Sequence, residues 1–232
     1  EWTTPNYYGV DLLDYGVRAE MTSGVRSGMF CFTYPESEKA FILIDLNHTL
    51  WQSCEWSNVR FENDSTLTGY KLVKGWGPER HIYFTAVFSR PFENYGIMQD
   101  TTPVVYNTKR FRSHLEAWGK NLKVWMKFKT ETGEKVYVKT AISAVSTEGA
   151  KLNIRELDGH TFETLKKAGE EKWSAELSKF VVKGSQKQLE TFYTSVYHAA
   201  LHPFVFQDAD GKFRELDKNI GQAEGSVSYT HL

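Results

Sequence analysis

Acidic residues surround a glycine near the end of the chain, in the stretch FQDADGKFRELD. Asp208, Asp210 and Glu215 carry the oxygen ligands that calcium prefers, and Gly211 can form a tight turn. An EF-hand loop needs oxygen ligands at its first, third and fifth positions and glycine at its sixth. Counted from Asp208, glycine already stands fourth and Lys212 fifth, which excludes an EF-hand. We expect a turn instead, with aspartate side chains accepting hydrogen bonds from nearby backbone amides.

Two histidines have the i, i+4 spacing of zinc ligands on a helix, His198 and His202. No glutamate follows His198 and no third ligand is evident in the sequence. His202 is expected in the last helical turn, where an imidazolium interacts favourably with the helix dipole. We therefore interpret the pair as structural, with a metal site as the alternative.

A single tryptophan is the strongest candidate for binding a ligand. Trp76 lies between Gly75 and Gly77 and before Pro78, in the stretch GYKLVKGWGPERHIYF between two expected strands. In that loop it is either a plug over one end of the fold or an exposed platform on which a sugar ring stacks. Acidic residues are abundant, but their spacing indicates no pair facing each other across a glycosidic bond.

Composition limits the possible partners of this 232-residue chain. The formal net charge of −1 gives no indication of a nucleic-acid groove or an anionic membrane surface. No run of 18 apolar residues is present, so no membrane span is predicted. Cys31 and Cys54 could pair only if neighbouring strands bring them together. The chain starts at Glu1 and not at methionine, which we interpret as a processed or cut start that does not identify the compartment.

The first 145 residues read as strands, two of which flank Trp76. Short alternating or apolar runs, each bounded by Gly, Pro, Asn or Asp, indicate eight or more strands. They include VRAEMT, GMFCFTY, AFILIDL, VRFEN, TLTGYKLV, HIYFTAVF, LKVWMKFKT and KVYVKTAIS. Gly133 marks a hairpin turn between the last two runs. This pattern predicts an antiparallel β-sandwich.

From Ser146 the apolar period becomes helical, and two or three amphipathic helices are predicted. Ser185 and Gln188 form a capping box at the start of the clearest helix, which Pro203 ends. Its apolar stripe runs from Leu189 to Leu201. Such wide apolar faces must either lie on the sandwich or belong to a larger helical domain.

Five stretches, in order and across nearly the whole chain, resemble glycoside hydrolase family 92, the calcium-dependent exo-acting α-mannosidases. They are YYGVDLLDYGVRAEMT, FTYPESEKAFILIDLNH, LTGYKLVKGWG with HIYFTAVFSRPF, KTAISAVSTEGAKLNI, and TFYTSVYHAALHPFVFQDADGKFRELD. The resemblance implies an N-terminal β-sandwich (a supersandwich) over residues 1–145, with an incomplete start. Linker helices and the beginning of a helical catalytic domain follow over 146–225 and lead to an (α/α)6 barrel. The tail, 226–232, departs from the family pattern, which continues into a Trp-Asp-Thr segment, and we expect it to be non-native.

The resemblance also implies a chemistry: inverting hydrolysis of terminal α-mannose on glycans such as N-glycans, with calcium as the cofactor. In this family the catalytic residues and metal ligands lie in the barrel, so we expect none in this chain, only Trp76 as a substrate-binding candidate and an inactive fragment. The implied location is periplasmic or secreted, and the implied partners are mannose-containing glycans and the missing catalytic domain. Two alternatives stay open: a stand-alone carbohydrate-binding sandwich without catalysis, and a sandwich that docks against a helical partner.

Overall fold

The computed structural model describes residues 1–75, 79–105 and 115–226 of the chain. Within them, strands dominate as far as Ser143 and helices follow from Thr147, so the predicted change from strand to helix is confirmed.

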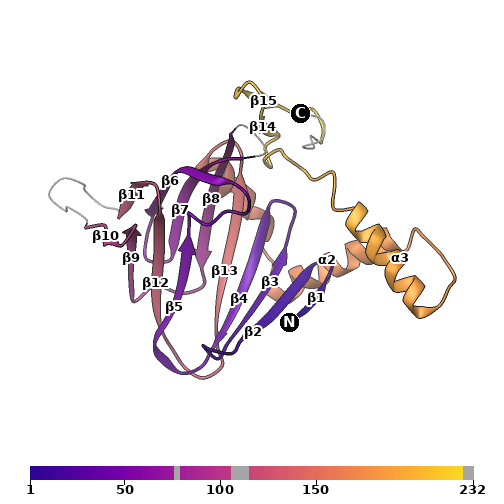
Figure 1. Cartoon of the computed structure of the whole chain (residues 1–232), viewed down its shortest axis with the longest axis horizontal. Coiled ribbons are helices and arrows are strands. Elements are labelled where there is room, and N and C mark those ends of the chain that lie inside the picture. Colours follow the sequence, from indigo (N-terminus) through magenta and orange to yellow (C-terminus); the bar gives the residue numbers. More distant parts are fainter. Residues whose placement is uncertain (76–78, 106–114, 227–232) are drawn as a thin grey trace.

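Two antiparallel sheets face each other and form a sandwich (Figure 1). In the described part of the chain, the larger sheet has nine strands in the order β1-β2-β3-β4-β13-β8-β7-β6-β11. Their bounds are β1 (Trp2–Thr4), β2 (Tyr7–Leu12), β3 (Val17–Ser23), β4 (Ser27–Tyr34), β6 (Ser53–Phe61), β7 (Thr66–Lys74), β8 (Arg80–Phe88), β11 (Glu116–Gly119) and β13 (Glu134–Ser143). The smaller sheet, in the order β10-β9-β12-β5, comprises β5 (Ser37–Asp45), β9 (Asn94–Gln99), β10 (Thr102–Pro103) and β12 (Leu122–Thr130). The predicted antiparallel β-sandwich is thus confirmed.

The main core fills the space between the two sheets. Alternate residues of β12 point into it and are fully buried, whereas the lysines between them reach solvent. These core residues are Leu122, Val124, Met126 and Phe128. They pack in one cluster with fully buried side chains of the larger sheet, among them Val59, Leu67 and Val136. The buried side chains of β12 therefore connect the smaller sheet to the larger one.

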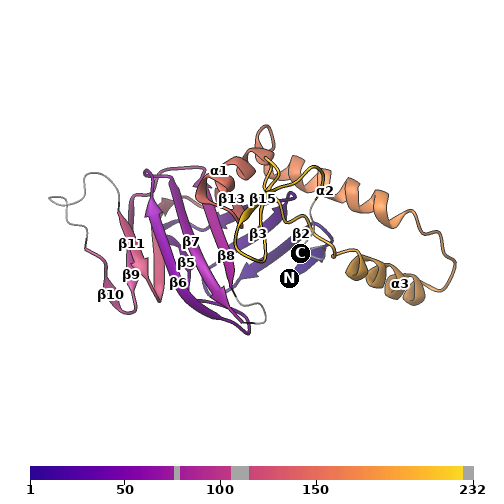
Figure 2. The same ribbon diagram turned by 90° about the horizontal axis from the view of Figure 1, so that it is seen from above.

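Helices cover part of the outer face of the larger sheet (Figure 2). They are α1 (Thr147–Asn153), the 3-10 helix η1 (Ile154–Leu157) and the start of α2 (Phe162–Leu177). Phe162, Leu165 and Leu157 form a second buried cluster with Met29 and Cys31 of β4. One alternative from the sequence, that the helices lie on the sandwich, is correct for these elements.

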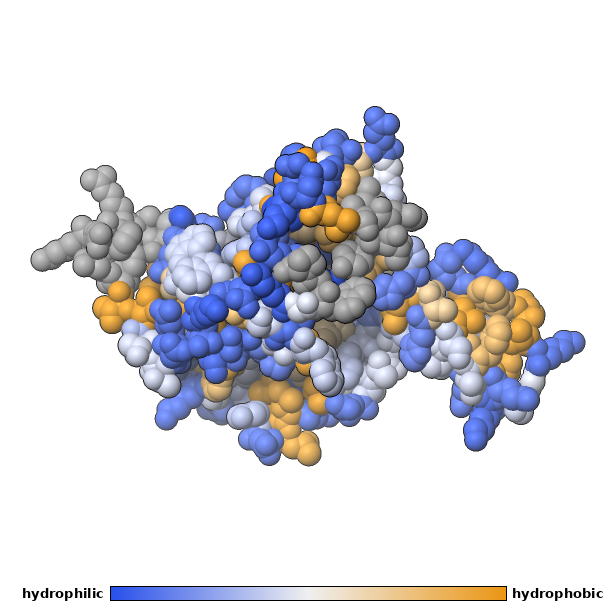
Figure 3. Space-filling view, turned by 45° about the horizontal axis from the view of Figure 1, so that its top comes forward, coloured by the Kyte–Doolittle hydropathy of each residue, from blue (hydrophilic) through white to orange (hydrophobic). Residues whose placement is uncertain are grey.

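The last helix, α3 (Gln186–Ala199), projects away from the sandwich (Figures 1 and 2). Its predicted capping box is confirmed, since Ser185 accepts from the Gln188 amide and the Gln188 side chain accepts from the Ser185 amide. No residue of α3 is buried. Tyr197 on the apolar stripe of α3 packs against Trp173 of α2, and the two ring centroids are 4.8 Å apart. Hydrophobic side chains gather at this projecting end (Figure 3).

Turns and short strands complete the fold. Gly133 adopts a φ of 80° between β12 and β13, which confirms the predicted hairpin turn. After α3, β14 (Lys212–Arg214) and β15 (Ile220–Gln222) form a small hairpin that the sequence did not predict. None of the helices in the described part of the chain has the length and apolar character that a membrane span requires.

The two cysteines do not pair. Cys31 and Cys54 are free thiols, both buried. Cys31 lies on β4 and Cys54 on β6, and β13, β8 and β7 separate the two strands in the sheet. At about 4.8 Å per strand, this puts the cysteines roughly 19 Å apart, beyond the reach of a disulfide.

Candidate functional site

A row of polar and aromatic side chains crosses the outer face of the larger sheet. The strand register pairs Trp118 with Asn58, Asn58 with Tyr70, Tyr70 with Tyr83, and Tyr83 with Ser143. Directly paired residues of antiparallel strands project on the same face of a sheet. Their neighbours along β6 and β7 point into the core, so this row lies on the opposite face. The pairing of five strands thus brings together residues from distant parts of the sequence.

The densest part of the row surrounds a histidine at the start of β8. The Tyr70 hydroxyl and His81 Nδ1 are hydrogen bonded at 3.0 Å, and the rings of Tyr70 and Tyr83 are 4.8 Å apart. His81 Nε2 lies 3.9 Å from Glu79 Oε2, and Lys218 Nζ lies 2.7 Å from that oxygen. What we call the Tyr70–His81 cluster comprises Tyr70, Glu79, His81, Tyr83, Arg214 and Lys218.

Electrostatics favour a neutral imidazole beside a carboxylate in this cluster. Burial lowers the pKa of His81, and the positive charge of Arg214 lowers it further. The hydrogen bond from Lys218 holds the pKa of Glu79 below its usual value. His81 Nε2 is buried and, within the described residues, has no hydrogen-bond partner. Glu79 is the single carboxyl group of the cluster, which therefore contains no pair of carboxyl groups for acid–base hydrolysis.

The predicted sugar platform, Trp76, lies outside the described residues, so its role stays a prediction. Near the two ends of the 76–78 segment, Lys74 Nζ lies 3.9 Å from Glu79 Oε1. Glu79 belongs to the Tyr70–His81 cluster, and the β7–β8 connection therefore leaves and rejoins the sheet beside this cluster.

A second group of polar residues joins the sandwich to the segment after α3. Asp208 is buried, and its carboxylate accepts from Ser143 Oγ at 2.6 Å and from Asn153 Nδ2 at 2.8 Å. Ser143 ends the last sandwich strand and Asn153 ends α1. A Cβ at Gly149 would overlap this carboxylate, so α1 can approach it only with glycine there. We call Ser143, Gly149, Asn153 and Asp208 the Asp208 junction.

An ion pair reinforces the same connection. Arg26 Nη1 lies 2.6 Å from Glu156 Oε1, and Arg26 Nε donates to the Gln207 carbonyl at 2.6 Å. Glu156 also accepts from the Arg26 amide at 2.9 Å. One arginine in the β3–β4 turn thus contacts both the 3-10 helix and the residue before Asp208.

The acidic stretch around Gly211 forms the predicted turn, but the side chain of Asp208 has partners that were not predicted. Gly211 has a φ of 84° and its amide donates to the Asp208 carbonyl, while Asp210 accepts from the Lys212 amide at 3.1 Å. The prediction of nearby backbone partners was correct for Asp210 and wrong for the Asp208 side chain, which binds residues far away in sequence. Burial raises the pKa of Asp208, as in a general acid, but the buried group cannot reach a substrate. Glu215 belongs to no metal-binding group either, because the described residues contain no cluster of three His, Cys, Asp or Glu side chains that could hold a metal ion.

The two histidines do not share a helix. His198 lies in α3, which ends at Ala199, and His202 follows it outside the helix. The predicted position of His202 in the last turn was therefore wrong. The physical reason is Pro203, which disfavours helical backbone at the residue before it.

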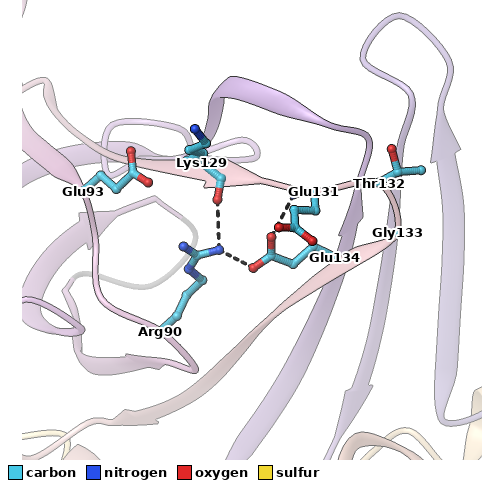
Figure 4. A pocket seen from close by; sticks show the side chains of 7 residues that line it. All are labelled: Arg90, Glu93, Lys129, Glu131, Thr132, Gly133 and Glu134. Carbon is cyan, nitrogen blue, oxygen red and sulfur yellow. Dashed lines mark hydrogen bonds and ion pairs between the residues drawn. The ribbon is translucent and has the colours of Figure 1, made fainter.

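An open polar cavity of about 550 Å³ lies between the β8–β9 connection and the β12–β13 hairpin (Figure 4). Its main cation, Arg90, is already bound to the Glu134 carboxylate and donates to the Lys129 carbonyl at 3.0 Å. The Glu131 amide donates to the other Glu134 oxygen at 2.9 Å. These contacts hold the hairpin turn, so we interpret the cavity as structural.

Sequence reasoning missed both the Tyr70–His81 cluster and the Asp208 junction. The alternation in TLTGYKLV and HIYFTAVF places Tyr70, His81 and Tyr83 on one face only when the register between the two strands is known. Asp208 is 65 residues from Ser143 and 55 from Asn153, and no local pattern reports such a contact.

Comparison with known families and structures gives one consistent result. Residues 1–143 match the glycosyl hydrolase family 92 N-terminal domain, and residues 149–232 match the glycosyl hydrolase family 92 catalytic domain. A search of curated proteins gave no match.

Mannosidases are among the similar solved structures. A family GH92 α-mannosidase from Bacteroides thetaiotaomicron is 66% identical to this chain, covers 98% of it and superposes with a TM-score of 0.94. The same enzyme was also solved in complex with mannoimidazole, again at 66% identity and a TM-score of 0.94. A family GH92 inverting mannosidase from the same organism, at 24% identity, 98% coverage and a TM-score of 0.84, shares the fold.

The chain spans about 31% of the length of the α-mannosidase that it matches at 66% identity. The N-terminal domain model alone matches more than half of the chain, from residue 1 to residue 143. The chain therefore belongs to glycosyl hydrolase family 92.

Proposed function

We propose that residues 1–225 are the sandwich and the first part of the catalytic domain of an exo-α-mannosidase that removes terminal α-mannose from glycans, and that 226–232 are a non-native tail. The observation that supports this best is the 66% identity over 98% of the chain to an α-mannosidase that was also solved with mannoimidazole. The resemblance to the family further suggests a periplasmic or secreted enzyme.

We also propose that the reaction inverts the configuration and that its two carboxyl groups lie outside this chain. Inverting enzymes separate the acid and the base by about 6.5–9.5 Å to leave room for a water molecule. Among the described residues, the buried Asp208 and the lysine-bound Glu79 do not meet this need. In this proposal the chain positions the catalytic domain, and Trp76 stays its candidate substrate-binding residue.

Calcium belongs to the same proposal, with ligands outside this chain. The described residues do not fit a calcium site, since they hold no group of three His, Cys, Asp or Glu side chains. The acids of the Gly211 turn are already bound, Asp208 to Ser143 and Asn153, and Asp210 to Lys212 at 2.6 Å. No step of the reaction is therefore assigned to calcium at these residues.

The direct test compares the full-length protein with the purified 232-residue chain on an aryl α-mannoside and a mannose-terminated N-glycan. We expect the full-length protein to release mannose, first as the β-anomer in proton NMR, and to lose activity with a calcium chelator. We expect the 232-residue chain to release none. Mannose release by the short chain would refute the assignment of catalysis to the remaining part, and an inactive full-length protein would refute the mannosidase.

The stand-alone carbohydrate-binding module is less well supported, because residues 149–232 match a catalytic-domain model and not a second binding module. Glycan binding by the full-length protein without any hydrolysis would favour it.

A further inference from the structure

Strand β5 forms one edge of the smaller sheet, and the structure shows which of its backbone groups face outward. Among the described strands, β12 is its single neighbour. The Leu46 amide donates to the Leu122 carbonyl at 3.0 Å, so the alternate residues Ile44 and Ile42 also direct their backbone groups to β12. It follows that the N–H and C=O of Leu43 point towards the open edge.

The contact of Phe41, two residues earlier, agrees with this assignment. Its carbonyl accepts a hydrogen bond from the Tyr34 hydroxyl at 3.2 Å, across the open side of β5. Phe41 and Leu43 therefore share one orientation, with backbone groups facing outward along the edge of the sheet.

The sequence of this edge lacks the usual protection. Edge strands of soluble proteins are blunted by charges, prolines, bulges or short length. Residues 40–44 read AFILI, without charge or proline, and the bulge in the β5–β12 pairing lies outside them. The side chains of Phe41 and Leu43 are 54% and 52% exposed. An edge of this kind is expected to be covered in the complete protein.

An apolar cavity of about 340 Å³, the β5 groove, lies directly beside this edge. One wall is β5, and the other is the part of the larger sheet formed by β2, β3 and β4, which the smaller sheet does not cover (Figure 1). Its lining includes Leu12, Val17, Phe32, Tyr34, Ala40 and Ile42. Phe30 and Phe32 stack beside it with parallel rings 6.1 Å apart. The open backbone edge and the apolar floor thus coincide.

We propose that the β5 groove holds an extended segment of the same protein, from outside residues 1–232, which adds to β5 as a further strand. A strand placed about 4.8 Å from β5 would pair with the Leu43 backbone, and every second side chain would enter the groove. A helix or a small molecule would not satisfy a row of alternating backbone donors and acceptors.

The source within the same protein follows from the comparison with the α-mannosidase. That enzyme keeps 98% of this chain in the same arrangement, with a TM-score of 0.94, although the matched part is 31% of its length. More than two thirds of a similar protein is therefore available to cover the groove. This inference rests on family membership and does not depend on the proposed activity.

The first test measures amide hydrogen exchange in the full-length protein. We expect the Leu43 amide to exchange at least about 100-fold more slowly than in an unstructured peptide, because an added strand protects it. Exchange of Leu43 at the unstructured rate, with the Ile42 amide protected by β12, would overturn the proposal.

Paired proline variants of the full-length protein give a second readout. Proline removes one backbone donor, so Ile42→Pro must break the β5–β12 ladder and lower the unfolding temperature in any case. Leu43→Pro removes an outward donor, and we expect a similar loss because the added strand needs it. A Leu43→Pro protein as stable as the wild type, beside a destabilised Ile42→Pro protein, would refute the proposal.

A photo-crosslinker identifies the occupant. Lys39 is exposed and lines the β5 groove, so we would replace it with p-benzoylphenylalanine in the full-length protein. We expect a crosslink within one polypeptide, to a segment outside residues 1–232. A crosslink to a second copy, or no crosslink together with fast exchange at Leu43, would refute the assignment to the same chain.

Discussion

At the scale of single residues, Asp208 binds Ser143 and Asn153 inside the protein, although the composition of its stretch is typical of metal-binding loops. The type of residue made the turn predictable, because Gly211 and Asp210 act through neighbours in sequence. The fate of Asp208 was not predictable, because Ser143 and Asn153 reach it only after the sandwich and α1 have formed. The same holds for His81, whose neighbours depend on strand register.

Asp208 and Asp210 are expected to affect stability in opposite directions as pH changes. Burial raises the pKa of Asp208, so the folded chain holds its proton to higher pH than the unfolded chain does, whose value is about 3.9. Its contribution to the free energy of unfolding therefore falls as pH rises from that value through the folded pKa, and then stays constant. We expect the stability of the 232-residue chain relative to Asp208→Asn, measured by urea unfolding from pH 3.5 upward, to decrease over this window.

Asp210→Asn is the matched control. The hydrogen bond from Lys212 lowers the pKa of Asp210, so its contribution is present above the unfolded pKa and is lost as pH falls through the folded pKa. Relative to this variant, the wild type should gain stability as pH rises. A relative stability that rose with pH for both variants would contradict the burial of the Asp208 carboxylate.

At the scale of elements, the parts of the fold with a strong local pattern were predictable. The alternation of LKVWMKFKT corresponds to β12 from Leu122 to Thr130, and the capping box at Ser185 starts α3. The strand predicted from VRFEN covers only the end of β6. The strand begins at Ser53, and a bulge near Trp56 interrupts the alternation that would have indicated its first part. The hairpin β14–β15 has two three-residue strands, too short for any period.

Helix α3 is expected to depend on its cap more than α2 does. Removing a serine cap costs about 1 kcal/mol, which corresponds to roughly fivefold faster exchange of the helix amides. Because α3 has no buried residue, packing cannot compensate for Ser185→Ala, and amides of residues 186–199 should exchange faster by this factor. The control is Thr161→Ala, which removes the same type of cap from α2, whose first turn is anchored by the buried Phe162. Equal acceleration in both helices of the 232-residue chain would show that this packing gives α2 no protection.

At the scale of the whole molecule, two apolar regions of the described chain stand out as uncovered. One is the β5 groove, and the other is the end formed by α3 and the segment before it, where Val181 is 88% exposed and Phe180 48% exposed. Exposed apolar patches of this kind mark contact surfaces. The sequence predicted the apolar stripe of α3, but not the groove, which depends on how far the smaller sheet extends over the larger one.

We expect the isolated 232-residue chain to bind an apolar fluorescent dye strongly and to self-associate, because both regions are open to solvent. The full-length protein should bind little dye per molecule. Fluorescence titration and light scattering at equal concentrations make the comparison. An isolated chain that stays monomeric and binds no more dye than the full-length protein would show that these surfaces need no cover.

The Asp208 junction has a consequence for how such proteins can evolve. The two family models meet between residues 143 and 149, which suggests a natural point for exchanging modules between genes. Ser143, on one side of that point, binds Asp208 on the other, and Leu157 completes the buried cover of β4 from beyond it. A recombination there would join a sandwich to helices that fit neither its outer face nor its last strand. The heritable unit therefore extends past the sandwich, at least to Asp208, and viable crossovers are expected outside this span.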